Sequence, residues 1–342
     1  NTSETSERLL AKFDWNISDA HRASFTYQST EEGGISSKGS NEFESSWYDV
    51  PVELTAYTAQ LFSDWAPNLS TTLRMNYKEF SRGQNCLAGG GGHFEFRLSP
   101  EELVGTSLEG LLTGRDQTII AGCDRFRHAN DYSDERLQLF ASANYFVGDH
   151  VLTFGMDYEQ FDLFNLFVQS SNGRFIFNDV QEIINRTPSS VFYNNAITNN
   201  ANDAAAEWGY DKWAFFIGDE WSVSSDLQIS AGVRYERFSQ SDKPVFSQEV
   251  FDTYGVRTDN NLDGRDLFMP RLGFLYTGFD RTTISGGVGL FAGGNPQVWI
   301  SNAFQTPTSD VTIRNLTNAD INTVPQEALD ALAASPAGIP ID

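Results

Sequence analysis

The sequence predicts an all-β fold, an antiparallel transmembrane β-barrel, of which this chain supplies about ten strands. Apolar and polar side chains alternate with a period of two along these strands, which gives each strand one apolar and one polar face. The connections are alternately very short and very long, and aromatic residues recur at two levels along the strands. Together these features are typical of a barrel with short periplasmic turns and long extracellular loops.

The alternation identifies the strands one after another. On the first strand, Leu9, Phe13 and Trp15 alternate with Lys12 and Asp14, and later strands repeat this pattern. The clearest examples cover, in chain order, residues 8–17, 22–28, 57–65, 73–78, 136–145, 152–159 and 227–236. A sheet whose two faces differ so regularly is expected to border an apolar medium on one side and water on the other.

The connections fall into two classes by length, and the length of each one predicts at which end of the sheet it lies. Five are tight turns: Ser18–His21, Ala66–Ser70, Val147–His150, Ser224–Asp226 and Thr277–Arg281. Five are long and polar, and we expect them to be extracellular loops: residues 30–51, 81–133, 169–210, 239–266 and 292–342. A soluble sheet has no reason to separate its turns from its loops in this way, whereas an outer-membrane barrel does. Because no linker divides the chain, we treat residues 1–342 as one partial barrel domain.

Aromatic side chains predict where the strands cross the two membrane interfaces. One set precedes the tight turns: Trp15, Trp65, Tyr145, Trp221 and Tyr276. A second set lies further along the strands: Tyr27, Tyr77, Tyr158 and Tyr235. Amphipathic rings are favoured at the level of the lipid headgroups, so two rows of them indicate outer-membrane lipid as the surroundings. The alternative is a soluble β-sandwich, in which two apolar faces would bury Trp15, Trp65 and Trp221 in a dry core.

Charge and hydropathy narrow the class of protein further. The 342 residues carry a formal net charge of −23, which argues against nucleic acid as a partner. Much of the acid lies in the long loops, and we interpret it as a solvated, repulsive surface, with specific cation binding as the alternative. The sequence has no run of about 18 apolar residues, so no helix is expected to cross a membrane. Its beginning and its end inside a loop lead us to expect a section of a longer polypeptide.

Two cysteines, Cys86 and Cys123, lie in the same long loop. In an oxidising compartment outside the cell they are expected to close that loop with a disulfide. Two unrelated free thiols are the alternative, but exposed thiols are poorly tolerated there, which favours the bridge.

One loop contains a candidate calcium site. Asp259, Asn261 and Asp263 stand at alternate positions before Gly264, as in the first half of a calcium-binding loop. The bidentate acid expected later is missing, because Pro270 occupies its place, so an ordinary Asp-Gly loop is the alternative. No other cofactor is expected.

No catalytic site is predicted, and we expect that the chain is not an enzyme. It lacks the HExxH and GxSxG patterns and any paired-cysteine metal motif. Its four histidines show no spacing that selects a catalytic arrangement: His21, His93, His128 and His150.

Two long loops are expected to contain short helices. Ser99–Glu102 begins one, with Ser99 as its cap and Pro100 in its first turn. Val324–Ala334 has an amphipathic pattern and Pro325 near its start. Such helices would cap the barrel mouth or bind a partner.

Several segments resemble strands of TonB-dependent outer-membrane receptors. The resemblance is carried, in the expected order, by Phe216–Trp221, Ser230–Glu236, Met269–Phe274 and Gly286–Phe291. Within that superfamily the chain is similar to the large Oar-like branch, through Asp124–Asn130, Asn202–Ala206 and Asn295–Asn302. The resemblance covers nearly the whole chain.

The resemblance implies a 22-stranded barrel with an N-terminal plug, energised by the TonB complex of the inner membrane. It also implies a receptor that binds a scarce extracellular substrate and imports it. A plug, a TonB-contacting segment and an aromatic-ended final strand are not among these residues, so import is expected of the parent protein. The alternative is a non-transporting scaffold or adhesion protein. In either case we expect Cys86–Cys123, 169–210 and 295–342 to bind the substrate or partner.

Overall fold

A computed structural model describes residues 4–314, except 38, 40, 108, 111–117, 197, 199, 295–296 and 306–307. The predicted helix Val324–Ala334 and much of the loop 292–342 lie outside the described residues.

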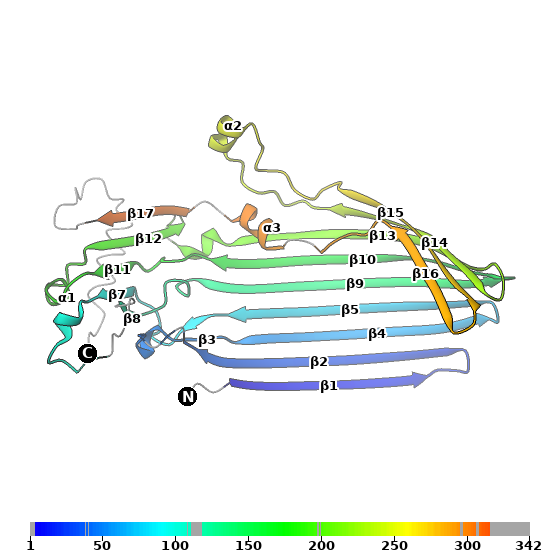
Figure 1. The fold of residues 1–342 in the computed structure, drawn as a ribbon, viewed down its shortest axis with the longest axis horizontal. Helices are drawn as coiled ribbons and strands as arrows, with labels where there is room; N and C mark the ends of the chain where they lie inside the picture. The colour runs from blue at the N-terminus through cyan, green and yellow to red at the C-terminus, as the bar shows by residue number, and fades with distance from the viewer. Residues whose placement is uncertain are drawn as a thin grey trace.

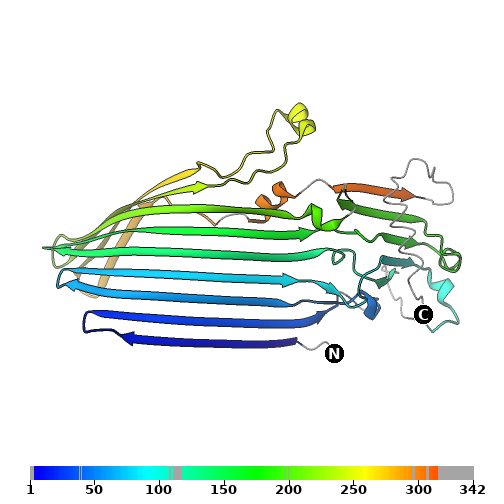
Figure 2. The ribbon, with the colours of Figure 1, turned by 180° about the vertical axis from the view of Figure 1, so that it is seen from behind.

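The structure is dominated by one antiparallel sheet of twelve strands (Figures 1 and 2). Two of the strands are only two residues long, β3 (Tyr48–Asp49) and β6 (Asn85–Cys86). The others are β1 (Glu4–Asn16), β2 (His21–Ser36), β4 (Val52–Ala66), β5 (Leu69–Gly83), β9 (Asn130–Val147), β10 (His150–Phe167), β13 (Ala206–Ser222), β14 (Leu227–Ser239), β15 (Asp266–Phe279) and β16 (Thr282–Gly289). These long strands pair in chain order, so the main sheet is an open meander with β1 and β16 at its edges.

The tight turns lie where the sequence predicts them, all at one end of the main sheet (Figure 1). Two of them contain a residue in the left-handed conformation, Gly148 with φ 58° and Arg281 with φ 57°. Glycine adopts this conformation without a steric penalty, whereas arginine adopts it at a steric cost.

A second, smaller sheet lies at the opposite end of the long strands (Figure 1). This small sheet has the strand order β17-β12-β11-β7-β8, and only the β11–β7 pair is parallel. Three of the predicted loops supply its strands: β7 (His93–Arg97), β8 (Thr118–Gly122), β11 (Arg174–Phe177), β12 (Ser190–Ala196) and β17 (Thr308–Arg314). One folded unit therefore contains parts of the stretches 81–133, 169–210 and 292–342, which do not form separate loops.

The small sheet has its own apolar core. Phe94 and Phe96 on β7 contact Phe175 and Phe177 on β11, with ring centroids 5.2 and 5.5 Å apart. Leu103, at the end of the 3-10 helix η2 (Pro100–Leu103), is buried in the same cluster, and helix α1 (Val180–Asn185) packs against it. The short helix predicted at Ser99–Glu102 is thus present, and the Glu102 carboxylate accepts a hydrogen bond from the backbone N–H of Ser99 at 2.8 Å.

The remaining helices are short. They are η1 (Glu44–Ser46), η3 (Ala201–Ala204), α2 (Gln248–Tyr254) and α3 (Gln297–Phe304). None of the helices among the described residues is long and apolar enough to span a membrane.

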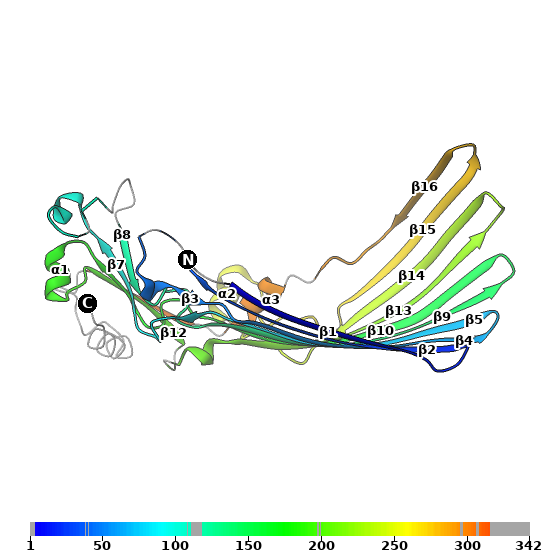
Figure 3. The ribbon, with the colours of Figure 1, turned by 90° about the horizontal axis from the view of Figure 1, so that it is seen from below.

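The main sheet bends and twists along its strands, which stay paired as far as the tight turns (Figure 3). Close approach of neighbouring strands accompanies this shape. A β-carbon at Gly232 of β14 would lie 3.0 Å from the carbonyl oxygen of Ile217 and 3.3 Å from the α-carbon of Gly218, both on β13. A β-carbon at this position would therefore require β13 to shift by a few tenths of an ångström, which favours glycine, as at other tight bends of barrel walls.

A Gly232→Ala substitution is expected to destabilise the sheet by about 1–3 kcal/mol, because the added methyl group overpacks the contact with β13. Gly33→Ala on β2 is the matched control, since its β-carbon would meet only the Thr5 Oγ1 atom at 3.5 Å. Urea unfolding of the full-length protein in lipid vesicles measures both variants. Equal unfolding midpoints would show that the bend does not depend on this glycine.

Candidate functional site: the polar face and the small sheet

The strand registers place the predicted aromatic residues on one face of the main sheet, here called the apolar face. Tyr27, Tyr57 and Tyr77 are direct partners on β2, β4 and β5, so their side chains project from the same face. Trp15 and Trp65 are 55% and 61% exposed, although they are among the largest apolar side chains of the chain. This exposure excludes the β-sandwich alternative, which requires these rings in a dry core.

The aromatic residues form two levels with a constant separation. Trp65 and Tyr57 lie eight residues apart on β4, and Trp221 and Trp213 lie eight residues apart on β13. Eight residues of strand extend for about 27 Å, which corresponds to about 20 Å of height at the tilt usual in barrels. Tyr57 and Trp213 are not among the residues predicted for the second row. Their distance of eight residues from Trp65 and Trp221 is the sequence signal that identifies them.

Tyrosines of the second row are hydrogen-bonded to carboxylates. Tyr77 donates to Glu79 at 2.7 Å, Tyr158 to Asp211 at 2.5 Å, and Tyr235 to Asp266 at 3.0 Å. The hydroxyl groups therefore point toward a charged, hydrated level beyond the apolar band, as is favourable for tyrosines at a membrane interface.

The opposite face, here called the polar face, carries a network of charges around Glu159 of β10. This carboxylate is 6% exposed and accepts hydrogen bonds from Tyr210 and Gln138, both at 2.8 Å. Lys212 and Arg136 lie 3.4 and 3.9 Å from it. A buried carboxylate surrounded by this many donors remains charged and fixes the positions of the neighbouring side chains.

The arginines of the polar face have different partners. Arg234 forms ion pairs with Glu236 at 2.7 Å and with Asp157 at 3.2 Å. Arg74 stacks on the Phe140 ring at 5.7 Å, and Arg271 stacks on the Phe291 ring at 4.7 Å. The polar face therefore combines paired charges with cations that face aromatic rings.

The polar face becomes aromatic toward the small sheet, which the regular alternation did not predict. Phe161 is fully buried and contacts the rings of Trp208 and Tyr210 at 5.6 and 5.3 Å. Helix α3 covers this cluster, with Phe304 stacked on Trp208 and the indole N–H of Trp208 donating to Ser301 at 3.1 Å. Helix α3 belongs to a loop that is distant in the sequence, and it folds back onto the sheet and buries these rings.

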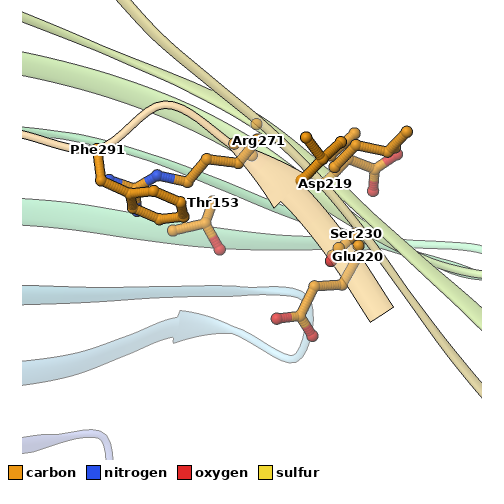
Figure 4. A pocket seen from close by; sticks show the side chains of 14 residues that line it. Thr153, Asp219, Glu220, Ser230, Arg271 and Phe291 are labelled. Atoms are coloured by element: carbon orange, nitrogen blue, oxygen red, sulfur yellow. The ribbon is translucent and has the colours of Figure 1, made fainter. Parts of the chain in front are cut away.

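A cavity of about 600 Å³ opens beside β13, β14, β15 and β16 (Figure 4). Glycines line much of it: Gly218, Gly232, Gly273, Gly287 and Gly289. Arg271 and Phe291 lie at one side of this cavity, and Glu220 and Ser230 lie lower in the view of Figure 4. Its size is that of an ordinary small-molecule site, and it offers both charges and an aromatic ring to a ligand.

A charged cluster lies on the face of the small sheet opposite its apolar core. Glu95 of β7 is 8% exposed and contacts Arg174 at 2.6 Å, Arg97 at 3.0 Å and His93 at 3.4 Å. Burial by itself raises the pKa of Glu95, but the hydrogen bonds from His93 and Arg174 outweigh it and hold the pKa well below its usual range.

Cys86 and Cys123 are joined by a disulfide, with their α-carbons 5.4 Å apart. The bridge links β6, at the edge of the main sheet, to the residue that follows β8 of the small sheet. It therefore fastens the two sheets to each other in addition to closing the loop between them.

The calcium candidates are engaged in contacts with the protein itself, and the Asp263 N–H donates to the Asn261 Oδ1 atom at 3.2 Å. Asp259 pairs with Arg257, which holds the pKa of this carboxyl below its usual value. The Asn261 side-chain amide donates to the carbonyl oxygens of Gln240 and Asp242, and Asp263 accepts from the backbone N–H of Gln240. Among the described residues no group of three or more His, Cys, Asp or Glu side chains could hold a metal ion.

Glu95→Leu is expected to destabilise the small sheet by about 3–5 kcal/mol, because Arg174, with a side chain only 17% exposed, would lose its partner. Arg97→Ala is the control within the same cluster. Its side chain is 47% exposed, so the loss should stay below about 1 kcal/mol. Hydrogen exchange of residues 174–177 and 190–196 measures both effects. Similar losses in the two variants would contradict the assignment of Glu95 as the central charge.

The comparisons with known proteins agree with this geometry. A family model described as an outer membrane beta barrel domain matches residues 1–340. The chain is similar in structure to the outer membrane transporter YddB from Escherichia coli, with a TM-score of 0.56 and 13% identity over 91% of this chain and 35% of that one. It is also similar to the open form of the ferric-catecholate import receptor Fiu from E. coli K12, with a TM-score of 0.50 and 9% identity over 84% of this chain and 46% of that one. At such identities the likeness concerns the fold alone.

The chain spans between about a third and a half of the length of these two solved structures. No curated protein matches it. The family match covers nearly every residue, and the exposed aromatic rows of the apolar face suit a lipid environment. The chain therefore belongs to the outer membrane beta barrel domain family and is located in the bacterial outer membrane.

Proposed function

We propose that this chain is part of the barrel of a TonB-dependent receptor of the Oar-like branch, which binds a scarce substrate outside the cell and imports it. The observation that carries this proposal is the asymmetry of the main sheet. Its apolar face suits lipid, its polar face carries fixed charges such as Glu159 and Arg234, and the small sheet stands at the loop end. A wide barrel with a charged interior and a folded extracellular cap is suited to binding and passage rather than catalysis.

The parent protein is proposed to close this sheet into 22 strands around a plug. The described strands β1 and β16 are the edges of the sheet and have no second neighbour. In hydrocarbon each unsatisfied backbone group costs several kcal/mol, so such edges are stable only when further strands pair with them. Additional strands on both sides would also enclose the polar face.

Lysine substitutions test which face contacts lipid. Leu73, on the apolar face of β5, is 47% exposed and lies between the two aromatic levels, whereas its neighbour Thr72 belongs to the polar face. Leu73→Lys is expected to destabilise the full-length barrel by about 2–4 kcal/mol, because the charge would lie near the bilayer midplane. Thr72→Lys should have a much smaller effect. Urea unfolding in vesicles measures both, and the reverse order would refute the membrane orientation.

A surface scaffold is the second candidate, and the segment between β14 and β15 favours it. This arm, residues 240–265, carries helix α2 and projects away from the main sheet (Figure 1). Tyr254 and Val256 at its tip are 75% and 57% exposed, and Phe251 is 40% exposed. An ordered arm with exposed apolar side chains is suited to docking a protein partner.

Binding to TonB separates the two functions without knowledge of the substrate. An importer should retain the periplasmic domain of TonB in a pull-down with the full-length protein. It should also be silent in planar bilayers until its plug is deleted, when a large conductance appears. A scaffold should not bind TonB, and deletion of residues 244–258 should release its surface partner. A full-length protein that neither binds TonB nor contains a plug would refute the importer.

A further inference from the structure

Two of the short segments that connect the small sheet to the main sheet are here called the neck. Residues 123–130 lead from β8 into β9, and residues 168–173 lead from β10 into β11. The two segments are hydrogen-bonded to each other, with Val168 N–H donating to the Ala129 carbonyl at 3.0 Å and Ser170 N–H to the Arg125 carbonyl at 2.8 Å. The two segments therefore form one hydrogen-bonded unit between the two sheets.

The ring of His128 joins the two segments of the neck. Its Nδ1 atom accepts a hydrogen bond from the backbone N–H of Asn172 at 3.0 Å. Its Nε2 atom lies 3.2 Å from the carbonyl oxygen of Cys123, to which it donates. Because one partner is an N–H and the other a carbonyl, the two contacts together require the neutral tautomer with its proton on Nε2.

The contact with Asn172 continues directly into the small sheet. Gly173, the next residue, accepts a hydrogen bond at its carbonyl from His93 N–H at 2.9 Å, and His93 begins β7. Gly173 has φ 86°, so glycine is favoured at this link. The Asn172 N–H is therefore one residue away from the hydrogen bond that joins Gly173 to β7, beside the strand pair β7–β11.

Charged groups around His128 come from the neck and from β7. Asp124 is buried beside it and favours the protonated ring, whereas His93 on β7 disfavours it. Glu95 and Arg174 lie beyond His93. Burial lowers the pKa of Arg125, and the nearby charge of Arg174 adds a smaller decrease. Burial of the His128 ring is the largest influence and lowers its pKa from 6.5 to about 4.

We propose that His128 is an acid-sensitive latch, whose protonation breaks the Asn172 bond and loosens the small sheet from the main sheet. A proton on Nδ1 replaces an acceptor by a donor, so the ring and the Asn172 N–H then repel each other. The same proton places a charge on a buried ring, where Asp124 offsets only part of the cost of burial. The Cys86–Cys123 disulfide keeps the first residue of the neck attached to β6.

The sign of the pH effect follows from the two states of the ring. In the open state His128 has its ordinary pKa near 6.5, and in the latched state its pKa is about 4. The open state therefore binds more protons between these values, so the latch is complete above about pH 6.5 and weakens as the pH falls toward 4. Between pH 7 and pH 4.5 the opening constant should rise roughly fifty-fold.

Hydrogen exchange of the full-length protein in vesicles at pH 7 and pH 4.5 tests the latch, after correction for the intrinsic pH dependence of exchange. The neck amides of Val168, Ser170 and Asn172 should lose about fifty-fold protection at pH 4.5, whereas residues 137–147 of β9 should keep theirs. Unchanged protection of these three neck amides in the native protein overturns the proposal.

His128→Asn is the decisive variant, because its amide oxygen can accept from Asn172 but does not titrate. This variant should lose the pH response, and His128→Gln serves if His128→Asn is unprotected already at pH 7. His150→Asn is the matched control, since His150 lies beside a tight turn and pairs with Asp219 at 2.8 Å. His150→Asn should retain the native response. A full pH response in both His128 variants overturns the proposal. A response that is lost in His93→Gln but kept in His128→Asn also overturns it, because His93 would then be the titrating residue.

Discussion

The rest of the structure depends on backbone pairing within the main sheet. Strands at bilayer depth have no water to bond their N–H and C=O groups, so each one must pair with its neighbours. The ladders between the long strands are almost continuous. In the described pairs the register shifts only between Asp64 and Ala66 and between Tyr276 and Phe279, both next to tight turns. The open edges at β1 and β16 are the places where this requirement is not met by the chain itself.

Fixed registers give the two faces their different chemistry. Once Tyr27, Tyr57 and Tyr77 are aligned, every second residue on those strands belongs to the apolar face. The residues between them include Arg74 and Lys78, which therefore lie on the polar face. Arginine and lysine are costly against lipid, and here they face carboxylates or aromatic rings instead.

The small sheet shows how long loops become a single rigid cap. Its strands come from three stretches of the chain, and its apolar core is separate from the main sheet. The Cys86–Cys123 bridge and the neck hold it at the loop end of the main sheet. The three stretches therefore present one formed surface with the buried Glu95 cluster, rather than independent loops.

The sequence alone determined the strands, the tight turns and the outward rows of aromatic residues. These features are local, because period-two alternation and rings beside turns such as Trp65 and Trp221 depend only on neighbouring residues. It also indicated the Cys86–Cys123 pair, since only two cysteines are present. The tertiary structure decided what joins residues far apart: the small sheet, the burial of Phe161 beneath α3, the Glu159 network and the contacts of His128. Those features depend on which loops meet in space. No local pattern in Phe94–Phe96 or Phe175–Phe177 predicts that these two segments pair.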